Sequence, residues 1–251
     1  MNDILAPPAP TSGASGFCRR CRATHRLPPA GAEREACQLM ERLERSGSIA
    51  LWPEHLDLPA LSTDPLFGDS RGKMFGVLEA LDRHRQTHFL YAFSGQYNGL
   101  WQVPGWAPPL FDVERFQRFN GPQEAHIKAL TRRIEQENEA TAIARLKAER
   151  TGRCRRLMNA IHGLYVLNNA RGDTATLDEV LGTDRGKPTG IGDCCAPKLL
   201  NHAAVIGLRP VSLVEFYFGR CNRSQSKHHK RFYPPCTDKC EPLLGFLLCG
   251  T

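Results

Sequence analysis

A chain of 251 residues, of which 41% are hydrophobic and 24% charged, can bury a core, and this composition excludes a disordered protein. The net charge of +7 and the pI near 9.0 favour a polyanionic partner. We find neither a run of roughly 20 apolar residues nor a signal peptide, and therefore expect a cytoplasmic protein with no membrane partner. In that compartment the ten cysteines are expected to be thiols or metal ligands rather than disulfides.

Residues 1–16 are rich in Pro, Gly and Ser and predict a flexible lead. The pair Cys18-x2-Cys21 follows, with His25 shortly after. Such a pair can contribute two thiolates to zinc, but no second Cys-x2-Cys follows at the spacing of a finger or ribbon. A structural or incidental pair is the alternative. Beyond it, residues 33–43 have apolar side chains at helical spacing.

Two short apolar runs, Met74–Leu78 and His88–Phe93, predict strands of one sheet joined by a hairpin-like connection. The irregular stretch that follows, residues 94–112, carries Trp101 and Trp106 among several Gly and Pro. In a basic protein such aromatic side chains can stack on unpaired bases; the alternative is that they pack the loop onto the body. We group residues 17–121 as an N-terminal α/β part.

Residues 122–170 are rich in helix formers and predict a long helix or a helical hairpin, with Pro122 in its first turn. The segment 145–156 is strongly basic, which suits contact with a phosphate backbone. A solvated helix face is the alternative. The candidate RNA-contacting residues of this segment are Arg145, Lys147, Arg150, Arg153, Arg155 and Arg156.

The part formed by residues 171–251 concentrates the cysteines, five of which lie between residues 190 and 244. Asp193 is expected to cap a helix that begins with Cys194 and Cys195. The positive end of a helix dipole lowers the pKa of a thiol placed there. A second helix is expected to begin near Asp238.

Between these two helices, residues 208–218 predict a buried strand that carries Glu215. Because a buried carboxylate is costly unless it is paired, Glu215 is either functional or an edge-strand residue facing water or an arginine. Several potential zinc ligands surround this strand in the sequence. The candidate metal ligands are Cys194, Cys236, Cys240 and His229.

Together these elements predict a mixed α+β fold: a small sheet packed with helices, a central helical segment and a C-terminal helix-strand-helix unit. Thiols at two helix starts with a strand between them are similar to zinc-dependent nucleobase deaminases, in which a Glu two residues after the first ligand moves protons. Here that position after Cys194 is Ala196, and the cysteine pair has Cys-x3-Cys spacing. Glu215 is a conceivable substitute, but nothing in the spacing requires it.

Five stretches resemble the long N-terminal extension of certain bacterial RluA-type pseudouridine synthases. The resemblance covers most of residues 30–250, and its last two motifs are long and unusual. The stretches are Gly72–Leu78, Phe93–Gln96 with Pro108–Asp112, Leu167–Gly172, Gly192–Leu200 and Phe232–Gly245.

In those synthases, the resemblance implies, a catalytic domain follows whose H-R-L-D motif supplies the catalytic Asp. The one His-Arg-Leu of this sequence begins at His25 and is followed by Pro28, so no catalytic residue is carried over. The resemblance implies an accessory module that binds structured RNA, either tRNA or rRNA, alone or with a synthase domain in trans. The alternatives are a zinc-dependent, deaminase-like nucleic-acid enzyme and a metal-stabilised protein-interaction module.

Overall fold

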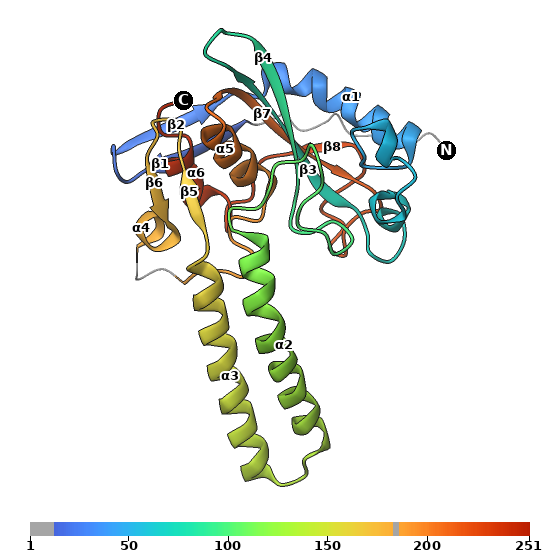
Figure 1. Cartoon of the computed structure of the whole chain (residues 1–251), viewed down its shortest axis with the longest axis vertical. Coiled ribbons are helices and arrows are strands. Elements are labelled where there is room, and N and C mark those ends of the chain that lie inside the picture. The colour runs from blue at the N-terminus through green and yellow to red at the C-terminus, as the bar shows by residue number, and fades with distance from the viewer. Residues whose placement is uncertain (1–12, 183–185) are drawn as a thin grey trace. The chain divides into compact units, whose positions relative to one another are not determined.

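The computed structural model describes residues 13–182 and 186–251 and has the expected mixed α+β architecture, organised around a four-stranded antiparallel sheet (Figure 1). The first two strands of this sheet form the predicted hairpin. The central pairing of the sheet joins two strands that are far apart in the sequence. The strands, in spatial order, are β4 (Thr87–Phe93), β3 (Lys73–Leu81), β7 (Arg209–Phe218) and β8 (Arg231–Tyr233).

The two faces of the sheet are covered by different helices. On one face, Phe75 and Val77 of β3 pack in the main hydrophobic cluster with Leu39 of α1 (Ala30–Ser46). On the other face, α5 (Cys195–Val205) lies directly against β3 at Gly76, where a Cβ atom would come within 2.6 Å of the Cβ of Cys195. Alternate residues of a strand point to opposite faces, so α1 and α5 enclose the sheet between them.

Smaller elements complete this part of the fold. The hairpin of β1 (Ala14–Cys18) and β2 (Ala23–Leu27) is crossed by α6 (Glu241–Leu247). A Cβ on Gly245 of α6 would lie 2.0 Å from the carbonyl oxygen of Phe17. The strand β1 includes residues 14–16, which we had expected to be flexible; residues 1–12 lie outside the described part of the chain. The elements are β1 (Ala14–Cys18), β2 (Ala23–Leu27), β5 (Val166–Asn168), β6 (Thr174–Thr176), α4 (Leu177–Leu181), α6 (Glu241–Leu247) and the 3-10 turns Pro53–His55, Pro59–Leu61 and Asp64–Leu66.

The middle of the chain is a helical hairpin, one of the two predicted alternatives, made of α2 (Val113–Gln136) and α3 (Ala140–His162). Asp112 caps α2 by accepting the backbone N–H of Arg115 at 2.8 Å. The helix therefore begins nine residues before the expected start at Pro122, which lies inside α2 at the cost of one helical hydrogen bond.

Two compact units result. One comprises residues 111–166, and the other comprises the chain up to Leu110 together with Leu167–Thr251. Residues 17–110 and 171–251, which we had placed in separate parts, thus belong to one unit, because β3 pairs with β7, whereas residues 111–121 belong to the hairpin unit. Within it, α5 begins at Cys195 with Cys194 rather than Asp193 as its N-cap, and α6 begins at Glu241 rather than near Asp238. Among the described helices, none has both the length and the apolar surface needed to cross a bilayer.

Candidate metal centres and nucleic-acid interface

Three of the predicted metal ligands, Cys194, Cys236 and Cys240, lie together at the starts of α5 and α6. We call this group the thiol triad. The Sγ atoms of Cys194 and Cys236 are 3.7 Å apart, and those of Cys236 and Cys240 are 3.3 Å apart. Two thiolates bound to tetrahedral zinc at about 2.3 Å each are separated by roughly 3.8 Å. The triad can therefore hold a metal ion.

Local backbone structure brings the triad together. Cys194 and Cys240 are the N-cap residues of α5 and α6, and Cys236 lies in the turn before α6. That turn is closed by a hydrogen bond of 3.2 Å from the backbone N–H of Cys240 to the carbonyl oxygen of Cys236. The Cys236 sulfur also accepts backbone N–H groups of Lys239 and Cys240. These donors favour a negatively charged sulfur at this position.

The three thiols shift one another's pKa in opposite directions. Hydrogen bonds with Cys194 and Cys240 lower the pKa of the Cys236 thiol, whereas the hydrogen bond with Cys236 raises the pKa of Cys194. Hydrogen bonds with Cys194 and Cys236 also raise the pKa of Cys240. A bound cation would let all three ionise, because metal binding displaces thiol protons.

The expected lowering of the pKa of Cys194 and Cys195 by the helix start is therefore not found. Cys195 points away from the triad: its thiol donates to the carbonyl oxygen of Met74 at 3.3 Å. Burial raises the pKa of the Cys195 thiol well above its usual value. Burial and hydrogen bonding thus outweigh the helix dipole at both positions.

Glu215 brings a buried carboxyl group to the triad from β7. Its side chain is 3% exposed, and its Oε1 accepts the backbone N–H of Ala196 at 2.7 Å. Burial raises the pKa of this carboxyl to about 7, and its charge contributes to the raised pKa of Cys194. An edge-strand position facing water is wrong for Glu215, since β7 is paired on both sides, with β3 and β8.

Two lysines lie close to these groups. The Nζ of Lys198, on α5, donates to the carbonyl oxygens of Phe93 at 3.0 Å and Gly95 at 2.7 Å, and burial lowers its pKa to about 8. Burial also lowers the pKa of Lys227, which interacts electrostatically with Glu215. Through its hydrogen bonds to Phe93 and Gly95, Lys198 fastens α5 to the end of β4 and to the segment after it.

His229, the fourth predicted metal ligand, is not part of the triad. Its Nδ1 accepts the backbone N–H of Gly219 at 3.0 Å, and its Nε2 lies 3.8 Å from a carboxylate oxygen of Glu44. Its ring packs edge-on against Phe218 and Phe67. His229 is thus near the cysteines only in sequence, and its side chain is held by other groups.

A second group of four potential ligands lies elsewhere in the same unit. Cys18, Cys21, His25 and Cys249 place their ligand atoms within 4.8 Å of one another. We call this group the terminal cluster. The sequence pointed to its first three members, but Cys249 was missed because no spacing rule connects it to them. This cluster, too, can hold a metal ion.

No protein-family model, curated protein or solved structure matches this chain. The relation to the extension of RluA-type synthases remains a prediction from sequence motifs. Two of those motifs, Gly192–Leu200 and Phe232–Gly245, contain all three thiols of the triad.

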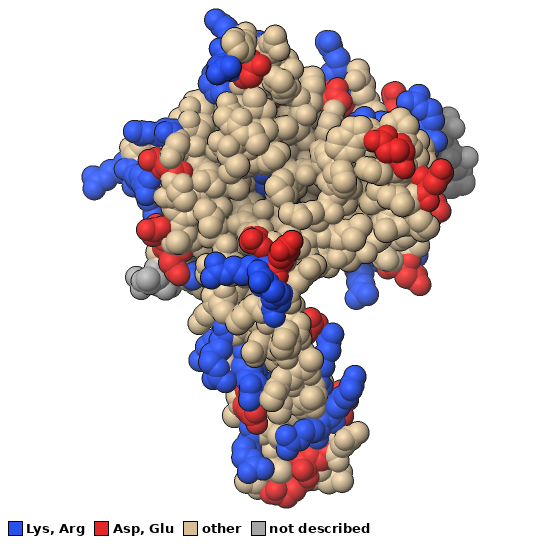
Figure 2. Space-filling view, viewed as in Figure 1, with Lys and Arg blue, Asp and Glu red and all other residues tan. Residues whose placement is uncertain are grey.

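The unit formed by residues 111–166 carries 11 Lys and Arg against 7 Asp and Glu, and so holds +4 of the net charge of +7. Figure 2 shows basic side chains along the visible face of this hairpin and acidic side chains gathered towards its turn. Two of the predicted RNA-contacting residues are engaged within the hairpin: Arg153 pairs with Glu149 at 3.2 Å, and Arg150 donates to Thr131 at 3.4 Å. The exposed ones are Arg145, Lys147, Arg155 and Arg156.

The two candidate base-stacking residues differ in exposure. Trp106 is 5% exposed, its indole N–H donates to the carbonyl oxygen of Ile49 at 2.9 Å, and its ring packs against Phe75. Trp106 is therefore a core residue in this structure, which favours the alternative that it packs the loop onto the body. Trp101 is half-buried, and the Nζ of Lys198 lies 5.9 Å from its ring.

Proposed function

We propose that this chain is an RNA-binding module in which the α2–α3 hairpin contacts the phosphate backbone. The observation that carries the proposal is the concentration of more than half of the net charge in residues 111–166. Structured tRNA or rRNA is the proposed ligand, and a pseudouridine synthase domain acting in trans is the proposed source of uridine chemistry.

The positions of the exposed cations support contact through one side of α3. Arg145 and Arg156 are separated by eleven residues, which places them about 20° apart around the helix and about 16 Å apart along it. Arg155 lies beside Arg156, about 100° further around the helix. The buried Leu146 is also about 100° from Arg145, on the opposite side from Arg155. The three guanidinium groups can thus reach several phosphates of one strand.

The test replaces Arg145, Arg155 and Arg156 together with Gln and measures binding of an unmodified tRNA transcript at several salt concentrations. Each lost phosphate contact is expected to lower the slope of log K against log salt by about 1, so the slope should fall by about 2 to 3. Far-UV circular dichroism checks that the hairpin remains helical.

A matched control removes the same charge from the other unit by replacing three exposed arginines of α1 and the β3–β4 turn. Unchanged affinity in the hairpin variant, or an equal loss in the control, would refute the proposal. If one of these results is found and the purified protein carries protein partners but no RNA, the alternative of a protein-interaction module is favoured. The control positions are Arg34, Arg83 and Arg85.

A second function, zinc-dependent deamination of an unpaired base, is favoured by the hydrogen bond between Glu215 and Ala196. Ala196 is the position two after Cys194, where zinc deaminases carry their proton-moving Glu. Position 196 carries no carboxyl group of its own, but the carboxyl group of Glu215 on β7 lies beside it. We propose zinc as the metal of the thiol triad because three thiolates leave one tetrahedral position free.

Zinc bound there would activate a water molecule for attack on the ring carbon that carries the amino group. In this proposal Glu215 would take both protons of that water in turn, delivering one to the ring nitrogen beside the attacked carbon and the other to the departing amino group, so that ammonia leaves and a carbonyl group remains. Its hydrogen bond from Ala196 holds the carboxyl in place. In the variant Glu215→Gln, the amide oxygen of Gln could still accept the hydrogen bond from the backbone N–H of Ala196.

The test incubates zinc-loaded protein with RNA oligonucleotides containing unpaired C or A and reads base conversion by sequencing. Glu215→Gln should abolish conversion while keeping about one zinc in the triad. Glu79→Gln, at a carboxylate of the neighbouring strand β3 that accepts the Ser212 hydroxyl at 2.7 Å, is the matched control. Absence of conversion by the zinc-loaded wild type, or equal activity in the Glu215 variant, would overturn this function.

A further inference from the structure

The terminal cluster joins both ends of the described chain at one point. Cys18 ends β1, Cys21 lies in the following turn, His25 is in β2, and Cys249 follows α6. The Sγ atoms of Cys21 and Cys249 are 3.8 Å apart, and the Sγ of Cys21 is 3.0 Å from the Nε2 of His25. We propose that these four side chains form a structural zinc site that fastens the β1–β2 hairpin to the end of α6.

The ligand number and spacing favour a closed zinc site. Three thiols and one imidazole complete a tetrahedral shell, which is the composition of structural rather than catalytic zinc sites. The 3.8 Å separation of Cys21 and Cys249 equals the roughly 3.8 Å expected for two thiolates on one zinc ion, and is nearly twice the roughly 2.05 Å of a disulfide bond. Cys18 and Cys249 are each only 1% exposed, so little room is left for a substrate.

The backbone around Cys18 is arranged to stabilise a thiolate. The Cys18 sulfur accepts hydrogen bonds from the backbone N–H groups of Cys21 and Arg20. The turn of the thiol triad has the same arrangement, in which backbone N–H groups reach the sulfur of Cys236. Donors of this kind orient a metal-bound sulfur and offset its charge.

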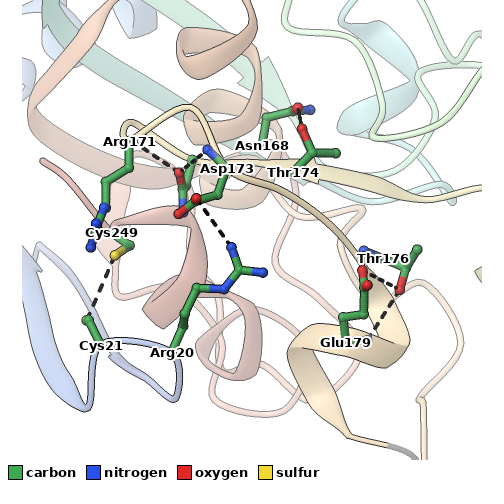
Figure 3. A network of polar contacts seen from close by, with 10 residues as sticks. Arg20, Cys21, Asn168, Arg171, Asp173, Thr174, Thr176, Glu179 and Cys249 are labelled. Carbon is green, nitrogen blue, oxygen red and sulfur yellow. Dashed lines mark hydrogen bonds and ion pairs between the residues drawn. The ribbon is translucent and has the colours of Figure 1, made fainter.

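Side chains outside the four ligands support the same site (Figure 3). The Arg171 side chain hydrogen-bonds the thiol of Cys249. Arg20, which lies between the two cysteines of the turn, pairs with Asp173 at 3.4 Å. Arg171 and Asp173 both lie in the segment between β5 and β6. This segment therefore contacts both the turn after β1, through Arg20, and Cys249.

Close packing of the two elements explains how the cluster forms. A Cβ on Gly16 of β1 would lie 2.3 Å from the backbone nitrogen of Gly245 in α6. The absence of side chains at both glycines lets the strand and the helix touch through their backbones. This contact brings the end of β1 to the end of α6, where Cys18 and Cys249 meet.

The experiment maps the reactivity of each cysteine towards N-ethylmaleimide in the full chain, before and after zinc removal by a chelator. Cys18, Cys21 and Cys249 are expected to be protected together while zinc is bound, and the half-buried Cys21 is expected to become reactive when zinc leaves. Cys37, which is exposed on α1 and belongs to neither cluster, is the internal reference and should react throughout. Metal analysis should find one zinc per chain for this site, in addition to any zinc in the triad.

A set of variants assigns that zinc. The double variant Cys21→Ser, Cys249→Ser should lose one zinc per chain, whereas Cys154→Ser should lose none. His25→Cys should retain the zinc, since four thiolates also form a structural site.

Three results would overturn the proposal: labelling of Cys18 and Cys21 in the untreated protein at the rate of Cys37, a disulfide among the three cysteines, or protection of the half-buried Cys21 that persists after zinc has left. These readouts need no variant, so they decide the question even if the cysteine variants do not fold.

Discussion

Replacing Gly76 with Ala should loosen the seat of α5 on the sheet and open the thiol triad. The new Cβ would lie 2.6 Å from the Cβ of Cys195 and 3.0 Å from Cδ1 of Leu199, whereas carbon atoms prefer about 3.5 to 4.0 Å. The helix must therefore retreat by about 1 Å. Such overpacking costs about 1 to 3 kcal/mol, which corresponds to a fall in Tm of roughly 2 to 4 °C per kcal/mol.

The same retreat would carry Cys194 away from Cys236. Metal–ligand distances are held to within about 0.2 Å, so a shift of about 1 Å should also weaken metal binding at the triad. Thermal unfolding measures the first effect, and titration with Co²⁺, followed by its thiolate absorption bands, measures the second. Both are expected to change in Gly76→Ala.

The control is Gly68→Ala in the same unit. The nearest atom to its new Cβ is the carbonyl oxygen of Pro65 at 3.7 Å, an ordinary contact, so the stability should change by less than about 0.5 kcal/mol. If Gly76→Ala melts and binds Co²⁺ as the wild type does, the inference that close packing at Gly76 positions Cys194 is refuted.

Three further predictions concern other parts of the chain. Gly245→Ala places a Cβ 2.0 Å from the backbone oxygen of Phe17 and should lower stability by at least about 1 to 3 kcal/mol; an unchanged Tm would contradict the close crossing of β1 and α6. Gly121→Ala in α2, with no atom within 4 Å of the new Cβ, should stabilise the hairpin by about 0.5 to 1 kcal/mol, and a lower helix melting temperature by circular dichroism would contradict this. Lys198, whose pKa is lowered by burial from 10.5 to about 8, binds fewer protons when folded than when unfolded between these values, so the free energy of unfolding should rise with pH across that window. Urea denaturation should show a weaker rise in Lys198→Met, and equal pH slopes would contradict the buried ammonium.

Local patterns in the sequence predicted much of the secondary structure. The apolar periodicity of residues 33–43 marked α1, and the aromatic run 88–93 marked β4. Element ends were predicted less well, since α2 begins after the Asp112 cap and continues through Pro122. The pairing of β3 with β7 has no local signal, because it depends on contacts between segments more than 100 residues apart.

The candidate site was predicted where chemistry and local backbone structure coincide. Cys194 and Cys240 stand at helix starts, and the sequence placed both near the beginnings of α5 and α6. Cys249 could not be predicted as a ligand, because 228 residues separate it from Cys21. The contact of Glu215 with Ala196 likewise depends on how α5 packs on β7, and residue spacing alone could not reveal it.

The hairpin is inserted between Leu110 and Leu167 of the unit that contains both thiol clusters. Its helices have their own caps at Asp112 and Glu139, so their formation does not depend on the metal ligands. RNA affinity that persists after zinc removal, with loss of any base conversion, would therefore assign binding and chemistry to different units. Loss of both RNA affinity and base conversion after zinc removal would contradict this assignment. The thiol clusters lie outside residues 111–166, so zinc removal is not expected to affect RNA binding by the hairpin.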